Sequence, residues 1–193
     1  GKLGMYDAVR HMAEHHLGPE EERRVRHRHA AFCAHTLERL ADQHGRLKGY
    51  DMLLNEVGEE NVWSAHAYAS QFDPDLALRI VYGILHLLSQ RTPLKTLIEV
   101  STQALEKAPN APSSLFHEVS YARSVMRLIA NTPGTLEELE AVLEWAQQTG
   151  NIRLEGRTLR GLSLYQQQGR DQIADGVRAV QLAEQVSEVE AAY

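Results

Sequence analysis

Two histidines near the start of the chain have the spacing of a shared helix face. His11 and His15 lie four residues apart with Glu14 between them, so a helix would present two candidate metal ligands together. A zinc site needs a third or fourth ligand, and the order His-Glu-x-x-His of helical zinc enzymes is missing. Histidines on a solvated or partly buried helix face are the alternative. We therefore predict no metal ligand and no cofactor, and a metal-dependent enzyme around His11 and His15 is an alternative hypothesis.

The chain contains one basic cluster, between residues 23 and 29. Its arginines are the residues that we predict to contact a partner: Arg23, Arg24, Arg26 and Arg28. Guanidinium groups suit nucleic-acid phosphates as well as the carboxylates of another protein or domain, so both kinds of partner are open. A third possibility is a solvated helix face, on which these arginines pair with the acidic residues at positions 20 to 22.

The chain has no sequence motif of a catalytic site. Glycine-rich phosphate-binding loops and the nucleophile elbow of hydrolases are missing. Cys33 falls on the expected apolar face of a helix, where a thiol packs as a small hydrophobe and lacks a base. We therefore predict that this chain is not an enzyme.

The composition is that of a folded soluble protein, since 43% of the 193 residues are hydrophobic and 24% are charged. The formal net charge is −6, and residues 51–193 hold 19 acidic against 11 basic side chains, which disfavours nucleic acid as the main partner. One cysteine cannot form an internal disulfide, so we predict a reducing compartment, the cytoplasm. No apolar stretch approaches the length of a membrane-spanning helix, about 20 residues, so we expect no membrane contact.

Hydrophobic periodicity predicts an all-α fold. From Leu115 to Val186, apolar residues recur every three or four positions, as they do along one face of a helix. Gly134 and Gly169 lie 35 residues apart, close to the roughly 34-residue period of tetratricopeptide repeats. We therefore predict a right-handed α-solenoid of antiparallel helix hairpins. In the last hairpin the apolar residues occupy more than one stripe, which predicts packing on two sides.

Turn residues set the expected helix boundaries. Every proline falls at an expected junction between helices, where a missing amide costs nothing: positions 19, 74, 93, 109, 112 and 133. Asp73 is expected to cap the helix that starts at Pro74. Thr135 and Glu138 have the spacing of a capping box, and Gly150 is expected to end the helix that this box begins.

We divide the chain into three parts. Residues 1–17 are expected to be the closing helix of an upstream winged-helix segment or a linker, residues 18–110 N-terminal helical repeats, and residues 111–193 tetratricopeptide-like hairpins. The chain opens on Gly1 instead of methionine, so we expect it to be a segment of a longer protein.

Four stretches of the chain resemble a known family. Met5 to Leu17 is similar to the helix that ends the winged-helix segment of STAND-class regulatory ATPases. Arg28 to Phe32 resembles the start of the helical sensor region of these proteins. Glu59 to Ala69 and Asp75 to Ile80 resemble two helices that follow in that region.

This resemblance implies a bacterial signal-transducing ATPase whose nucleotide domain lies upstream and whose tetratricopeptide-like superhelix senses an inducer or partner. For the chain itself, the expected stack of hairpins with a concave inner face and the absence of catalytic motifs predict a non-catalytic sensor and protein-interaction scaffold. On its concave face the scaffold would bind a partner protein, another domain of the parent chain or a small-molecule inducer. The alternative is a segment of a nucleic-acid-associated transcriptional regulator, which contacts phosphates through the residues from Arg23 to Arg28.

Overall fold

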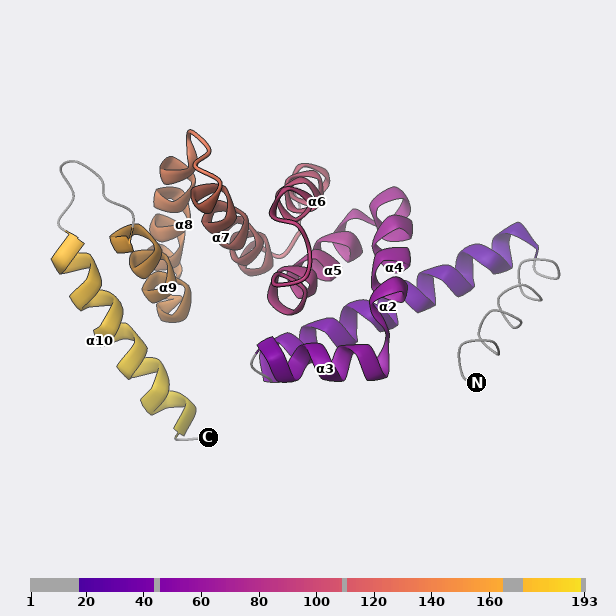
Figure 1. Cartoon of the computed structure of the whole chain (residues 1–193), viewed down its shortest axis with the longest axis horizontal. Helices are drawn as coiled ribbons and strands as arrows, with labels where there is room; N and C mark the ends of the chain where they lie inside the picture. Colours follow the sequence, from indigo (N-terminus) through magenta and orange to yellow (C-terminus); the bar gives the residue numbers. More distant parts are fainter. Residues whose placement is uncertain (1–17, 44–45, 109–110, 165–171, 192–193) are drawn as a thin grey trace. The chain divides into compact units, whose positions relative to one another are not determined.

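In a computed structural model, the described residues of the chain fold mainly into α-helices (Figure 1). The structure describes residues 18–43, 46–108, 111–164 and 172–191, and these ranges contain no strand, so the prediction of an all-α fold is confirmed. None of the helices in these ranges has the length and apolar character needed to cross a membrane. The helix expected within residues 1–17 and the turn expected at Gly169 lie outside the described residues.

The chain divides into two compact units, which meet in sequence at Leu87 and Leu88. The described helices of the first unit are α2 (Pro19–Gln43), α3 (Arg46–Glu56), α4 (Glu59–Phe72) and α5 (Pro74–Leu87). Those of the second unit are α6 (Leu94–Lys107), α7 (Ser113–Ile129), α8 (Thr135–Thr149), α9 (Ile152–Leu164) and α10 (Gln172–Ala191). We expected a division between residues 110 and 111; by packing, α6 belongs with α7 in the second unit.

In the first unit, the 25-residue helix α2 packs against α3, α4 and α5. At 1.5 Å per residue it is about 37 Å long, which is enough to contact three shorter helices. At Gly83, α5 lies so close to α2 that a Cβ would be 2.4 Å from the Cβ of Leu37. All four helices contribute fully buried side chains: Leu37, Leu40, Leu53, Val62, Leu78, Ile80 and Ile84. Because α5 also contacts α2, α3 and α4, these helices form a bundle-like arrangement, and the solenoid packing that we expected here is not confirmed.

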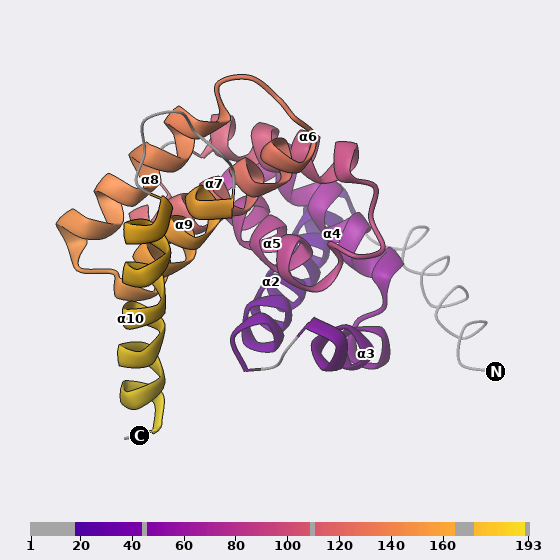
Figure 2. The ribbon, with the colours of Figure 1, turned by 60° about the vertical axis from the view of Figure 1, so that its left-hand side comes forward.

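In the second unit, each helix packs against the next one along the chain, and α7 also contacts α9. Figure 2 shows α10 running alongside α9. The larger apolar cluster of this unit contains Leu139, Leu143, Leu159, Leu162, Ala179 and Leu182. A second cluster contains Val142, Ala146 and Leu154, with Trp145 packed against it. The order of contacts is one that hairpins of a helical-repeat array make.

The turn residues predict some helix ends correctly and one wrongly. The carboxylate of Asp73 accepts the amide N–H of Leu76 at 3.0 Å, which confirms the cap of α5. Gly150 ends α8 with a φ of 68°, as expected. The prediction of a capping box at Thr135 and Glu138 is wrong, because Gly134 occupies the N-cap position of α8. The Thr135 hydroxyl instead donates to the carbonyl oxygen of Thr132, three residues earlier, at 2.6 Å.

Candidate functional site

The arginines of the basic cluster lie on the first half of α2 and have different surroundings. Arg26 pairs with Glu22 at 2.6 Å, one turn earlier on the same helix. The guanidinium carbon of Arg23 lies 5.8 Å from the ring centroid of Phe72 in α4. Arg24 and Arg28 are exposed, and neither has an ion-pair partner among the described residues. The four predicted contact residues therefore do not form a single surface.

Arg23 and Arg26 border a cavity of about 440 Å³ between α2 and α4. Tyr68 and Phe72 form an aromatic wall of this cavity, with ring centroids 5.0 Å apart. The Tyr68 hydroxyl donates to the carbonyl oxygen of Arg23 at 3.1 Å, which holds α2 and α4 together here. Guanidinium groups beside aromatic rings suit a planar group with negative charge. Glu22, which pairs with Arg26, also lines this cavity, so the cavity holds one acidic side chain beside its two guanidinium groups.

Cys33 lies in the core of the first unit and is fully buried. Its sulfur lies 3.6 Å from Nε2 of His29, one turn earlier on α2. Burial raises the pKa of the Cys33 thiol to about 11 and lowers the pKa of His29 below its ordinary value. The thiol is therefore protonated at neutral pH, whereas a nucleophilic cysteine needs a lowered pKa and access to a substrate.

Metal binding is not supported by any cluster in the described part of the chain. Within residues 18–43, 46–108, 111–164 and 172–191, no three histidine, cysteine or acidic side chains are placed to bind one metal ion. His11 and His15 lie outside these ranges, so the metal hypothesis for that pair stays a hypothesis.

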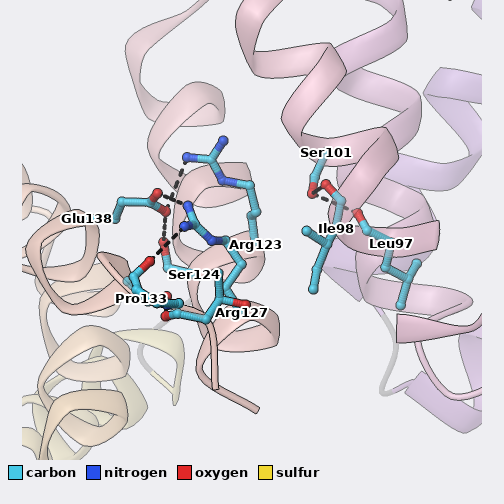
Figure 3. Close-up of polar contacts among 10 residues, drawn as sticks. Leu97, Ile98, Ser101, Arg123, Ser124, Arg127, Pro133 and Glu138 are labelled. Atoms are coloured by element: carbon cyan, nitrogen blue, oxygen red, sulfur yellow. Dashed lines mark hydrogen bonds and ion pairs between the residues drawn. The ribbon is translucent and has the colours of Figure 1, made fainter. Parts of the chain in front are cut away.

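A carboxylate on α8 receives three donors from α7, as Figure 3 shows. Glu138 accepts from Ser124 Oγ at 2.9 Å and from Arg123 Nη2 at 3.2 Å, and it also pairs with Arg127. Arg127 donates in addition to the carbonyl oxygen of Pro133 at 3.0 Å. The side chains of Arg123, Arg127 and Glu138 are only 16%, 21% and 26% exposed. The Glu138 carboxylate thus pairs with two largely buried guanidinium groups, and this network holds α8 against α7.

Three side chains connect α7 with α9. Arg157 of α9 donates to the Glu118 carboxylate of α7 at 2.7 Å, and its guanidinium carbon lies 4.6 Å from the ring centroid of Tyr121. The Tyr121 hydroxyl donates to the backbone oxygen of Arg157 at 3.1 Å. Burial raises the pKa of Tyr121 above its ordinary value, so this hydroxyl remains a donor at neutral pH. These contacts hold two helices side by side that are not neighbours in the chain.

A largely apolar groove of about 460 Å³ runs between α9 and α10. Leu182 in its floor is fully buried, whereas Val180 at its margin is 59% exposed. Arg153 and Arg160 of α9 also line the groove; both are exposed, and neither has an ion-pair partner among the described residues. The groove therefore exposes apolar surface of the kind that a binding partner covers.

The sequence predicted packing on two sides for the last hairpin, and this prediction holds for one side of α10. Ala179 and Leu182 are buried in the cluster that contains residues of α9. Val177 and Val180 form a second stripe on α10 that is 53% and 59% exposed, so packing on this side is not observed among the described residues. Val180 of this stripe lines the groove and Val177 does not, and our predicted site residues included neither.

No protein-family model, curated protein or solved structure matches this chain. The resemblance to STAND-class ATPases therefore rests on the four sequence stretches alone, and it stays a prediction.

Proposed function

We propose that this chain is a non-catalytic sensor and protein-interaction scaffold of a larger signal-transducing regulator, in which the second unit is part of a right-handed tetratricopeptide-like solenoid. The order of helix contacts in that unit carries the proposal, because each helix packs on the next and α7 also contacts α9. Repeat arrays have this order, since each hairpin contacts only its neighbours. On this proposal α7 and α9 are the inner helices of successive hairpins, and their common face binds the partner.

The polar networks of the second unit support a scaffold more than a reaction site. Glu138 is occupied by three donors from α7, and Glu118 is occupied by Arg157. A general acid or base must reach a proton of the substrate, whereas these carboxylates hold helices together. Networks of this kind keep the spacing of the helices fixed, which a preformed binding face requires.

The family resemblance supports the wider setting of the proposal. It suggests that the parent protein is a cytoplasmic STAND-class ATPase and that the scaffold senses a partner protein, another domain or a small inducer. The cavity beside Arg23 and Arg26 is the place in the first unit that a small anionic inducer would suit.

Photo-cross-linking from α7 tests the proposed binding face. Ser114 is exposed and precedes Glu118 by four residues and Tyr121 by seven, so it lies on the side of α7 that carries the link to α9. A photoreactive residue at Ser114 in the full chain should form an adduct with one partner in cells. The same residue at the exposed Glu144 of α8 is the control and should not.

The partner captured at Ser114 must then bind the purified chain. The variant Ser114→Arg should weaken this binding, and Glu144→Arg should leave it unchanged. Equal adducts from both positions, or no adduct from Ser114, would contradict a binding face on α7 and α9.

Contact with nucleic-acid phosphates is the second candidate function, and one observation favours it. Arg24 and Arg28 lie four residues apart on α2, are exposed, and have no ion-pair partner among the described residues. This candidate predicts duplex binding that falls steeply with salt and disappears in the double variant Arg24→Glu, Arg28→Glu. No retention of duplex DNA in a filter-binding assay at about 50 mM salt would exclude it.

A further inference from the structure

We infer that the groove between α9 and α10 binds an amphipathic helix with acidic side chains, supplied by a partner protein. The inference rests on the proposed function in one respect, because it treats the chain as an interaction scaffold. It goes further by adding a binding surface between α9 and α10, which is bordered by Arg157, the residue that links α9 to α7, and by defining the chemistry of the partner.

The floor of the groove has the character of a helix-packing surface. Ala179 and Leu182 are buried at the contact of α10 with α9, while Val180 beside them is 59% exposed. Around Gly176, which also lines the groove, there is open space where a Cβ would stand. A third helix along α9 and α10 would remove this apolar surface from water, as helices of the unit already do for one another.

The edge of the groove on α9 supplies charge complementarity. Arg153 and Arg160 are seven residues apart, which is nearly two helical turns, so they lie on one side of α9 about 10 Å apart along its axis. Both are exposed and without an ion-pair partner among the described residues. Arg157 lies between them in sequence and is already paired with Glu118. This edge is thus positive in a chain whose net charge is −6.

These two features together define the occupant. Apolar residues at positions i, i+3 or i+4, and i+7 of a helix would cover the groove floor. Two carboxylates seven residues apart on the same helix would match the spacing of Arg153 and Arg160. A basic helix would fill the floor but meet both arginines with like charge, and a nucleic acid would leave the apolar floor uncovered. A second copy of this chain is the competing occupant, which the test below separates.

A pair of designed peptides probes the groove in the full chain. The acidic probe is a fluorescein-labelled amphipathic helix of about 21 residues, three heptads, with leucines on one face and glutamates beside them. Its twin carries lysines in place of the glutamates. In fluorescence anisotropy the acidic peptide should bind one chain and should bind about tenfold more tightly than the basic twin, a preference that weakens as salt rises.

Two matched substitutions on α10 locate the binding site. Val180 and Val177 are exposed to a similar extent, but only Val180 lines the groove. Val180→Glu should therefore weaken binding of the acidic peptide at least about tenfold, whereas Val177→Glu should have little effect. The double variant Arg153→Glu, Arg160→Glu should reverse the preference between the two peptides. Circular dichroism checks that each variant keeps its helix content.

Several results would overturn the inference. These are the absence of peptide binding, equal binding of both peptides, equal effects of the two valine substitutions, or an unchanged preference in the double arginine variant. If sedimentation shows that the chain forms a dimer, and if Val180→Glu dissociates this dimer, then the groove binds a second copy of the chain instead. If the peptides do not bind but Ser114 forms a specific adduct, the groove inference alone is refuted. If the peptides bind as expected but Ser114 forms no specific adduct, only the proposed binding face on α7 and α9 is refuted.

Discussion

Loss of the Glu138 carboxylate should destabilise the second unit strongly. In Glu138→Gln, the cations Arg123 and Arg127 lose their common anion while their side chains remain only 16% and 21% exposed. An exposed ion pair contributes at most about 1 kcal/mol, and breaking a fully buried pair costs about 3–5 kcal/mol. Because Glu138 itself is 26% exposed, we expect an intermediate loss of about 2–3 kcal/mol of unfolding free energy.

Urea unfolding followed by the fluorescence of Trp145 measures this loss. The chain has two tryptophans, and Trp63→Phe leaves Trp145 of α8 as the reporter of the second unit. With urea slopes of about 1–3 kcal/mol/M, the midpoint should fall by about 0.7–3 M. The control is Glu144→Gln on the same helix, whose exposed carboxylate accepts from Gln148 at 3.0 Å and from no other side chain among the described residues. It should change stability by less than about 0.5 kcal/mol.

A double-mutant cycle tests the physical cause. If the cost of Glu138→Gln comes from unpaired cations, then removing the charge of Arg127 with Arg127→Met should cost less in the Glu138→Gln background than in the parent. The coupling should exceed about 1 kcal/mol, because the two side chains are in direct contact. A loss no larger than that of Glu144→Gln, or additive effects of the two substitutions, would refute our account of the network.

Three further predictions concern packing and titration. Gly83→Ala should destabilise the first unit by about 1–3 kcal/mol, because the added Cβ would overlap Leu37. Gly176→Ala should stabilise α10 by up to about 1 kcal/mol, because there is open space around Gly176. The urea midpoints of the two variants test both predictions. Since burial raises the Cys33 pKa to about 11, the thiol should react with a disulfide reagent at pH 8 at least about 100-fold more slowly than in urea. Burial lowers the pKa of His29, so the unfolded chain binds its proton more readily; stability should fall as pH decreases through 6.5, and His29→Gln should reduce this fall in urea midpoints.

The helices could be predicted from the sequence because their signals are local. Apolar periodicity and the dipeptide Asp73-Pro74 act within one or two turns of chain, and both agree with the structure. The role of Glu138 could not be predicted in this way, because its spacing from Thr135 is also that of a capping box. Arg123 and Arg127 of α7 both donate to the Glu138 carboxylate, and they reach it only because α7 packs on α8.

The sequence also could not show how the four arginines predicted to contact a partner are distributed on the fold. Four arginines in six residues look like one basic surface in the sequence, but a helix turns them to different sides. Arg23 lies over Phe72, a residue 49 positions later, and this contact depends on the packing of α4 against α2. Arg153 and Arg160 are seven positions apart in the sequence, and their common edge beside α10 exists only in the folded structure.

Binding in the groove and stability of the second unit are thermodynamically linked, which provides an independent check on the further inference. A ligand that binds only the folded unit stabilises it by RT ln(1 + [L]/Kd), about 2.7 kcal/mol at a concentration of 100 Kd. The acidic peptide should therefore raise the urea midpoint reported by Trp145, because α8 packs on α9, which forms one wall of the groove. Val180→Glu should abolish this rise and Val177→Glu should preserve it. If anisotropy detected binding while the Trp145 transition stayed in place, the peptide would be bound elsewhere, because a ligand of the folded groove must shift the unfolding of the unit that contains it.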